Sequence, residues 1–258
     1  MNTELLFSVR GKVALVTGGT RGIGYMIADG LVRAGARVYI SSRKAEACAQ
    51  AAAELSAHGE AIAIPADLGD PAGVSAVSTE LAAREPKLDI LVNNAGANWG
   101  APFESFPQSG WDKVMDLNVR SIFFLTQQLA PLLKAAATPE DPARVINIGS
   151  VDGMTCPDYG NYSYAASKAA VHHLTRHLAK HLAAADINVN AIAPGPFPTK
   201  MTEVMLRDAG ERIFSVIPRR RTGLPSDIAG SVIFLASAAS AYITGAVIPV
   251  DGGFSTTR

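Results

Sequence analysis

Short apolar runs alternate with helical patterns along the whole 258-residue chain. Strands that are buried on both faces read as continuous apolar runs, whereas half-exposed strands alternate apolar and polar residues. A repeated order of strand and helix predicts βαβ units, which join parallel strands through right-handed crossovers. The expected strands are 13–16, 38–40, 61–64, 90–92, 145–148, 187–192 and 247–250.

The segments between these strands have helical spacing or no strand pattern. Helices are expected near 71–84, 109–136, 162–184 and 226–237, with two more after the first and second strands. We therefore predict an α/β fold in three layers, a doubly wound seven-stranded parallel sheet of the Rossmann type. The absence of a linker or repeat predicts a single domain over 1–258, and the strand-free segment at about 196–225 is predicted to be a substrate lid.

Composition excludes several classes of protein. The 23 basic and 23 acidic residues give a net charge of zero, which suggests neither a nucleic-acid nor an anionic-membrane partner. Cys48 and Cys156 form no metal-ligand spacing and no disulfide framework. The chain shows no signal-peptide pattern and no apolar run of the ~18–20 residues that a membrane span requires. A cytoplasmic enzyme is expected.

A glycine-rich turn joins the first strand to the first helix. Gly18, Gly22 and Gly24 would permit a tight turn, a close approach of backbone to a pyrophosphate, and close packing of helix on strand. The N-terminus of the helix would then offer free N–H groups and a partial positive charge to the phosphates. The turn therefore predicts a dinucleotide site, and a plain tight turn is the alternative.

The end of the second strand indicates which dinucleotide is bound. NAD-binding units carry a carboxylate there for the ribose 2′-hydroxyl, but this chain reads Ser41-Ser42-Arg43-Lys44. Arg43 and Arg21 would meet a 2′-phosphate with forked guanidinium donors. NADP(H) is predicted, unless Arg43 and Lys44 only begin a solvated helix.

Three side chains form a candidate catalytic group. Tyr164 and Lys168 are four residues apart at the start of a helix and therefore share a face. A nearby ammonium, together with the positive charge of an oxidised nicotinamide, is expected to lower the phenol pKa, so that Tyr164 can protonate the alkoxide formed by hydride transfer to a ketone. Ser150, directly after the fifth strand, would polarise the substrate oxygen. A chance Tyr–Lys pair and a helix-capping Ser150 are the alternatives.

Several motifs together resemble the short-chain dehydrogenase/reductase family over essentially the whole chain. The closest branch is the 3-oxoacyl-[acyl-carrier-protein] reductases, particularly the rhamnolipid-biosynthesis type, on the stretches 93–100, 143–151 and 246–254. The motifs are Thr17–Gly24, Asp67, Asn93-Asn94-Ala95-Gly96, Asn118, Ser150, Tyr164-Ala165-Ala166-Ser167-Lys168, Pro194-Gly195 with Thr199, and Asp251-Gly252-Gly253.

The resemblance implies further roles. Asp67 would bind the adenine beside Leu68, Asn94 would line the cofactor channel, and Thr199 would hold the nicotinamide carboxamide. Asn118 would belong to a proton relay through water, with a buried hydrogen-bond anchor as the alternative. The protein would form a homotetramer that acts in lipid metabolism. The cofactor contacts implied in full are Gly18, Thr20, Arg21, Gly22, Ile23, Gly24, Ser42, Arg43, Asp67, Leu68, Asn94, Ala95, Gly96, Tyr164, Lys168, Pro194, Gly195, Phe197 and Thr199.

The expected reaction is NADPH-dependent reduction of a 3-oxoacyl thioester or a similar hydrophobic ketone. An apolar lid with Met201, Leu206 and Phe214, faced by Trp99 and Phe103, suits an acyl chain. The acidic stretch 139–142 stands where related reductases are basic for docking acyl carrier protein, so acyl-CoA and free ketones stay open as substrates. A sugar acid, steroid or small ketone is the alternative, and a non-catalytic nucleotide sensor is a third hypothesis.

Two features depart from the expected pattern. The gap from Ser150 to Tyr164 is one residue longer than the commonest family spacing, which should reshape the substrate mouth in the loop 152–161. Four histidines follow on the same helix, namely His172, His173, His177 and His181. A third metal ligand with matching spacing is not evident, so surface or subunit-contact histidines are expected and no metal site is predicted.

Overall fold

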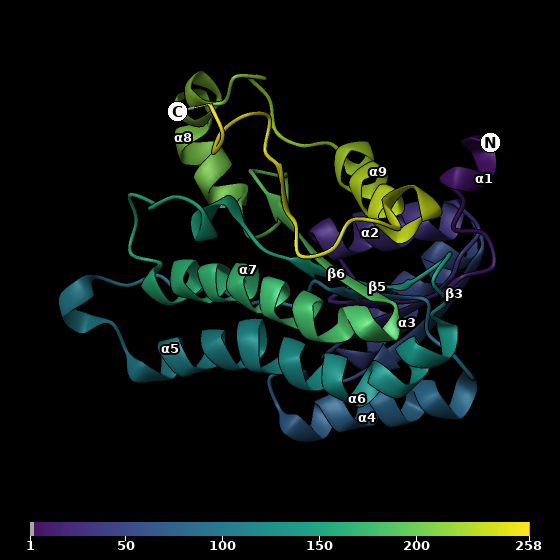
Figure 1. Ribbon diagram of the computed structural model, residues 1–258. Coiled ribbons are helices and arrows are strands. Elements are labelled where there is room, and N and C mark those ends of the chain that lie inside the picture. The colour runs from purple at the N-terminus through teal and green to yellow at the C-terminus, as the bar shows by residue number, and fades with distance from the viewer. Residues whose placement is uncertain (1–2, 258) are drawn as a thin grey trace.

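The computed structural model describes residues 3–257, apart from the side chains of Val204, Met205 and Ala209. Its described part contains one parallel sheet in the order β3-β2-β1-β4-β5-β6-β7 (Figure 1). The predicted fold class is confirmed, and each predicted strand overlaps an observed one. The strands are β1 (Val13–Thr17), β2 (Arg37–Ser42), β3 (Glu60–Pro65), β4 (Ile90–Asn93), β5 (Ala143–Ile148), β6 (Ile187–Pro194) and β7 (Val247–Val250).

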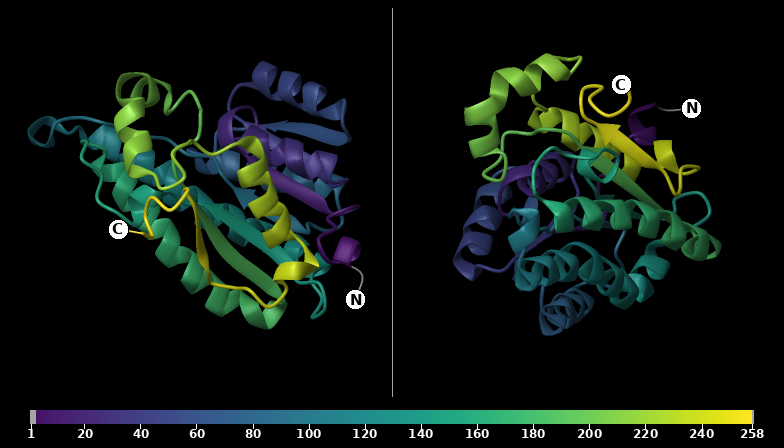
Figure 2. Two further views of the ribbon diagram at one scale, coloured as in Figure 1. Left: turned by 90° about the horizontal axis from the view of Figure 1, so that it is seen from above. Right: turned by 90° about the vertical axis from the view of Figure 1, so that its left-hand side faces the viewer.

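Two hydrophobic cores lie on opposite faces of the sheet. Alternate residues of β1 enter different cores, Ala14 and Val16 on one face and Val13 and Leu15 on the other. The first core is closed by α2 (Gly22–Arg33), α3 (Ala45–Ser56) and α9 (Pro225–Ala236), and the second by α4 (Pro71–Arg84), α6 (Ser121–Ala136) and α7 (Tyr162–Leu182). Figure 2 shows the resulting three layers.

The helix predicted over 109–136 is interrupted in the structure. It consists of α5 (Gln108–Met115), a π-helical turn over Asp116–Arg120, and α6. A π turn adds one residue to a helical turn and often marks a functional site. This turn carries Asn118, one of the predicted catalytic residues.

The segment predicted to be a lid contains a helix, α8 (Glu203–Val216). It lies beyond the carboxyl ends of the strands, on the same side of the molecule as the start of α7 (Figure 1). In open parallel sheets ligands bind at this edge, where the strand order reverses next to β1. A short helix, α1 (Thr3–Leu6), precedes β1. Within residues 3–257, no helix combines the length and the apolarity that a membrane span requires.

Candidate active site

The structure brings Ser150, Tyr164 and Lys168 together at the carboxyl edge of the sheet. Ser150 follows the end of β5 and is buried, its Oγ accepts from the Asp152 N–H at 3.1 Å, and its hydroxyl lies near enough to the Tyr164 phenol to lower the pKa of that phenol. Because Lys168 is one helical turn after Tyr164, its ammonium lies 5.5 Å from the centre of the Tyr164 ring. Lys168 Nζ also donates to the Ile148 carbonyl at 2.7 Å. The three side chains thus form a single polar group at the head of α7.

Burial dominates the acid–base properties of this group. Desolvation raises the pKa of Tyr164 to about 12, against the hydrogen bond with Ser150, and the carboxylate of Asp152 adds to the rise. Desolvation also lowers the pKa of Lys168 to about 8. Loss of hydration is thus the largest effect on this phenol in the protein alone. The predicted lowering by the ammonium and an oxidised nicotinamide together stays a prediction. Tyr164 stays protonated at neutral pH, which is the form that can donate a proton.

Asn118 is fully buried, and the hydrogen bonds of its side chain go to the loop after β4 and to α7. Its Oδ1 accepts from the backbone N–H of Ala97 at 2.8 Å, and its Nδ2 donates to the Ala97 carbonyl at 3.0 Å. Nδ2 also donates to Ser167 Oγ at 2.9 Å, next to Lys168 on α7. Asn118 therefore anchors the loop after β4 to α7, the helix that carries Tyr164 and Lys168. The proton relay through Asn118 stays a prediction from the family resemblance.

The glycine loop between β1 and α2 is shaped for close approach. Gly18 and Gly22 have φ values of +66° and +55°, a region that side chains disfavour. A Cβ on Gly24 would lie 2.3 Å from the Gly18 carbonyl oxygen, so only glycine lets α2 pack on the loop. The amide of Asn94 donates to the Thr17 carbonyl at 2.8 Å and ties the loop to the end of β4.

The N-terminus of α2 faces an open cavity. Its N-cap residue Arg21 is extended and makes no capping hydrogen bond, so first-turn N–H groups are available to an anion. The cavity has a volume of about 800 Å³, and its walls include Thr20, Arg21, Gly22 and Thr199. The side chain of Ile23, by contrast, packs against the hydrophobic core.

The residues predicted to bind adenosine lie where β2 and β3 end. The Arg43 side chain is 60% exposed, and its guanidinium lies 4.0 Å from the Asp67 carboxylate. Ser42 Oγ accepts from Thr20 Oγ1 at 3.3 Å, which joins this region to the glycine loop. Leu68 is buried in the second core. The predicted partners of the 2′-phosphate and of the adenine are therefore neighbours.

The segment after β6 lies close to both the glycine loop and the C-terminal Asp251. Pro194 ends β6, and a Cβ on Gly195 would lie only 2.8 Å from the Asp251 Cα. The Thr199 side chain lies against the loop, 3.2 Å from where a Cβ on Gly22 would stand. The ring of Phe197 is 1% exposed and packs in the core, so any contact of Phe197 with a cofactor is left to its backbone.

The strip Asn94–Gly96 connects the glycine loop to the catalytic group. Asn94 Nδ2 lies 3.3 Å from the Gly18 carbonyl oxygen, and the Ala95 N–H donates to the loop at Thr17 Oγ1. At the other end of the strip, a Cβ on Gly96 would stand 3.8 Å from Lys168 Nζ. A molecule lying along this strip would therefore contact both the glycine loop and the lysine.

His172 is a residue of this region that the sequence did not single out for the site. It follows Lys168 by one helical turn, is 4% exposed, and lies so close to Gly149 that a Cβ there would be 2.2 Å from His172 Nε2. Desolvation, with the charges of Lys168 and Arg176, lowers its pKa from 6.5 to about 4. The spacing from Lys168 was visible in the sequence, but the burial was not.

This shift predicts a loss of stability in acid. The unfolded chain binds a proton at His172 below pH 6.5, whereas the folded protein resists it until about pH 4, so stability falls as the pH drops through this window. We expect wild type to lose about 3 kcal/mol more unfolding free energy between pH 7 and pH 4 than His172→Gln does. Urea titrations at each pH measure this difference. His173 is exposed, so His173→Gln should lose as much unfolding free energy as wild type over this pH range. If the unfolding free energies of wild type and His172→Gln fell equally with pH, His172 would not be the source of the acid sensitivity.

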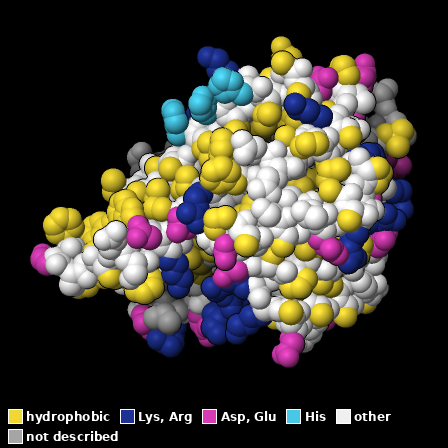
Figure 3. Space-filling view, turned by 90° about the horizontal axis from the view of Figure 1, so that it is seen from below, with side chains coloured by type: hydrophobic (Ala, Val, Ile, Leu, Met, Phe, Trp, Pro, Cys, Tyr) yellow, Lys and Arg dark blue, Asp and Glu magenta, His cyan; other side chains and the backbone are white. Residues whose placement is uncertain are grey.

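The other histidines of α7 are exposed. The Nε2 atoms of His177 and His181 lie 3.1 Å apart, and His173 is one turn earlier on the same helix. Histidine side chains gather at one margin of the face drawn in Figure 3. Among the described side chains, no three histidine, cysteine, aspartate or glutamate residues are placed to hold a metal ion.

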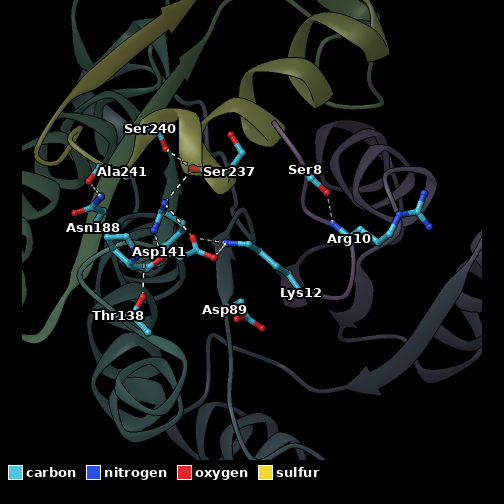
Figure 4. Close-up of polar contacts among 12 residues, drawn as sticks. Ser8, Arg10, Lys12, Asp89, Thr138, Asp141, Asn188, Ser237, Ser240 and Ala241 are labelled. Atoms are coloured by element: carbon cyan, nitrogen blue, oxygen red, sulfur yellow. Dashed lines mark hydrogen bonds and ion pairs between the residues drawn. The ribbon is translucent and has the colours of Figure 1, made fainter. Parts of the chain in front are cut away.

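The acidic stretch 139–142 is occupied by internal contacts. Both oxygens of Asp141 accept from Lys12 Nζ at 2.7 Å, and Arg144 Nη2 lies 3.5 Å from Asp141 (Figure 4). Arg144 is buried and donates to the carbonyl of Ser237 at 3.0 Å and to that of Pro142. The stretch thus braces the amino end of β5, at the edge of the sheet opposite Ser150.

Comparison with known proteins places the chain in a family. A family model described as enoyl-(acyl carrier protein) reductase matches residues 18–255. The Pseudomonas aeruginosa rhamnolipids biosynthesis 3-oxoacyl-[acyl-carrier-protein] reductase is 55% identical over 250 residues, which cover 96% of this chain and 98% of that protein. The 2-dehydro-3-deoxy-D-gluconate 5-dehydrogenase of Dickeya dadantii is 38% identical over 258 residues, with coverages of 96% and 97%.

Solved structures agree with these matches. The Pseudomonas aeruginosa RhlG/NADP active-site complex superposes with a TM-score of 0.94 at 54% identity, covering 99% of this chain and 100% of that one. The family model, the identity to known members and the superposition of the folds all point to the same family. The chain belongs to the short-chain dehydrogenase/reductase family of oxidoreductases, as its motifs predicted.

Proposed function

We propose that this protein reduces a 3-oxoacyl thioester, or a similar hydrophobic ketone, to the alcohol with NADPH. The observation that carries the proposal is the contact of Ser150, Tyr164 and Lys168, joined to the glycine loop through Asn94–Gly96. The 55% identity to a protein named as a 3-oxoacyl-[acyl-carrier-protein] reductase supports the substrate class.

The residues present fit NADP(H). The uncapped N-terminus of α2 and the positive φ of Gly18 and Gly22 form a cradle for a pyrophosphate. Arg43 would hold the 2′-phosphate, Asp67 the adenine, and Thr199 the nicotinamide end. The solved Pseudomonas aeruginosa structure that superposes on this chain is described as an RhlG/NADP active-site complex. When bound, NADPH supplies the hydride.

The chain's own groups handle the substrate oxygen. The Ser150 hydroxyl would donate to the carbonyl oxygen and fix it beside Tyr164. As hydride adds to the carbonyl carbon, the phenol of Tyr164 transfers its proton to that oxygen and the C=O group becomes an alcohol. Lys168, held by the Ile148 carbonyl, places a positive charge near the phenolate left behind and stabilises it, and a proton taken up from solvent then restores the phenol.

The mouth of the site supports a hydrophobic substrate. Phe103 is 74% exposed and contacts the Tyr162 ring edge-on at 5.8 Å between centroids. Met201, in the segment before α8, is 53% exposed. Trp99 packs instead against Gly110 of α5, so it stiffens the wall rather than facing the lid freely. Apolar surface of this kind suits an acyl chain better than a sugar.

The carrier of the acyl group is part of the proposal. Asp141 is committed to Lys12 and Arg144, so the acidic stretch is a structural brace and offers no basic docking surface for a carrier protein. We therefore favour a CoA thioester or a free ketone ester over a carrier-bound substrate. A homotetramer in the cytoplasm, which the family resemblance implies, stays a prediction.

The decisive experiment follows NADPH oxidation with a panel of carbonyl compounds. We expect a 3-oxoacyl-CoA or its N-acetylcysteamine analogue to be reduced with a kcat/KM at least about tenfold above that of sugar acids and steroids, because the mouth is apolar. Preferred turnover of a sugar acid would favour a gluconate-type dehydrogenase. Tight NADPH binding without turnover of any compound would favour a nucleotide sensor and overturn the proposal.

A further inference from the structure

Asp152 is held rigidly beside the catalytic group. It lies in the 3₁₀ turn Val151–Gly153, and its backbone N–H donates to Ser150 Oγ at 3.1 Å. Its carboxylate Oδ2 accepts two hydrogen bonds of 2.9 Å, one from the hydroxyl of Tyr159 and one from Nδ2 of Asn161. Both partners belong to the loop 152–161, which carries the extra residue relative to the common spacing. The loop therefore fixes this carboxylate at the site.

The negative charge of Asp152 acts on the catalytic residues. It raises the pKa of Tyr164 and opposes the fall in the pKa of Lys168, so its field reaches both groups. Hydrogen bonds from neutral donors leave the net charge in place. No lysine, arginine or histidine of the part described here forms an ion pair with Asp152. A substrate carbonyl bound at Ser150 would thus stand close to a carboxylate that has no ion-pair partner among the described residues, with the Lys168 ammonium within reach of its field.

We propose that Asp152 determines specificity by repelling substrates with a carboxylate near the reacting ketone. The inference rests on the proposed function, since it presumes that a ketone binds between Ser150 and Tyr164. A 3-oxoacyl thioester is neutral at this end, whereas a free 3-oxo acid carries a negative charge there. The same site would therefore accept the ester and reject the acid.

The size of the effect follows from Coulomb's law. Two like charges about 6 Å apart at a partly exposed site repel each other enough to change binding by about tenfold or more. Because Asp152 is only half-buried, dissolved salt should screen part of this repulsion. A purely structural role of Asp152 would affect neutral and charged substrates alike and would show no such dependence on salt.

The test compares ethyl acetoacetate with acetoacetate, which present the same ketone and differ in one negative charge. We expect wild type to favour the ester, and Asp152→Asn to reduce the ester-to-acid ratio of kcat/KM by about tenfold. The carboxamide that this substitution introduces retains an oxygen that can accept from Tyr159 and Asn161. Taking the ratio cancels any change in proton donation by Tyr164, which both substrates need. A loss of positive charge at Lys168 would weaken binding of the acid and raise the ratio, opposite to the expected fall.

Two controls separate charge from structure. Asp158→Asn removes another carboxylate of the same loop, 93% exposed and 3.9 Å from Arg212, and should leave the ratio unchanged. Asp152→Glu keeps the charge and should retain the preference for the ester. If Asp152→Asn fails to fold, wild type still provides a test, because 0.5 M NaCl should lower the ester-to-acid ratio by about twofold or more.

The outcomes are distinct for the two proposals. An unchanged ratio in folded Asp152→Asn, or a salt-independent ratio in wild type, would overturn the role of Asp152 while reduction of the ester still supported the proposed function. A wild type that reduces neither the two acetoacetates nor a 3-oxoacyl thioester would refute the proposed function itself.

Discussion

Tyr164→Phe is expected to lower kcat for ketone reduction by about 10²–10⁴-fold, with little change in the Kd for NADPH. The substitution removes the hydroxyl that bonds to Ser150 and carries the transferable proton, but it retains the ring 5.5 Å from the Lys168 ammonium. Ser150 would still polarise the carbonyl oxygen, so some activity should remain. Steady-state kinetics and a fluorescence titration with NADPH measure the two quantities.

Tyr162→Phe provides the matched control for this prediction. Tyr162 begins the same helix and is 44% exposed, but the residue four positions later is Ala166 rather than a lysine. Its loss of a hydroxyl should change kcat by less than about threefold, since the phenol is not placed to protonate the substrate. Similar activity of Tyr164→Phe and wild type would show that another group donates the proton.

Arg43→Asp should reverse or erase the preference for NADPH, with a change of about 100-fold or more in the ratio of kcat/KM for NADPH to that for NADH. A guanidinium that attracts the 2′-phosphate would be replaced by a carboxylate that repels it, and the same carboxylate can accept from the 2′-hydroxyl of NADH. The new carboxylate would also stand near Asp67, which lies 4.0 Å from the present guanidinium.

Two further variants define the origin of this effect. Arg43→Ala removes the attraction for the 2′-phosphate without adding repulsion. Its ratio of kcat/KM for NADPH to that for NADH should therefore lie between the ratios of wild type and Arg43→Asp. Lys44→Asp makes the same change of charge at the adjacent, exposed N-cap of α3 and should alter the ratio by less than about tenfold. If the preference survives Arg43→Asp unchanged, this arginine is not the selector.

Local patterns in the sequence determined the architecture and identified side chains that the fold brings together at the candidate site. Apolar runs such as Val13–Val16 specify buried parallel strands, because side chains on both faces of such a strand must be removed from water. The observed strands coincide with these runs. Gly18, Gly22 and Gly24 predicted the loop between β1 and α2. Neighbouring atoms stand so close to Gly18 and Gly24 that a side chain there would collide with them, and Gly22 has a positive φ that side chains disfavour. Spacing of four residues placed Tyr164 and Lys168 on one helical face.

Only the tertiary structure decided how these residues behave. The pKa of Tyr164 rises because neighbours from several elements exclude water around it, and the sequence shows only the adjacent charges. The ring of Phe197 enters the core, and Asn118 sits in a π turn that a helical pattern does not reveal. Hydrophobic periodicity indicates which face of a helix or strand is buried. The hydration of a side chain, the charges around it and its contacts with distant segments depend on how the elements pack.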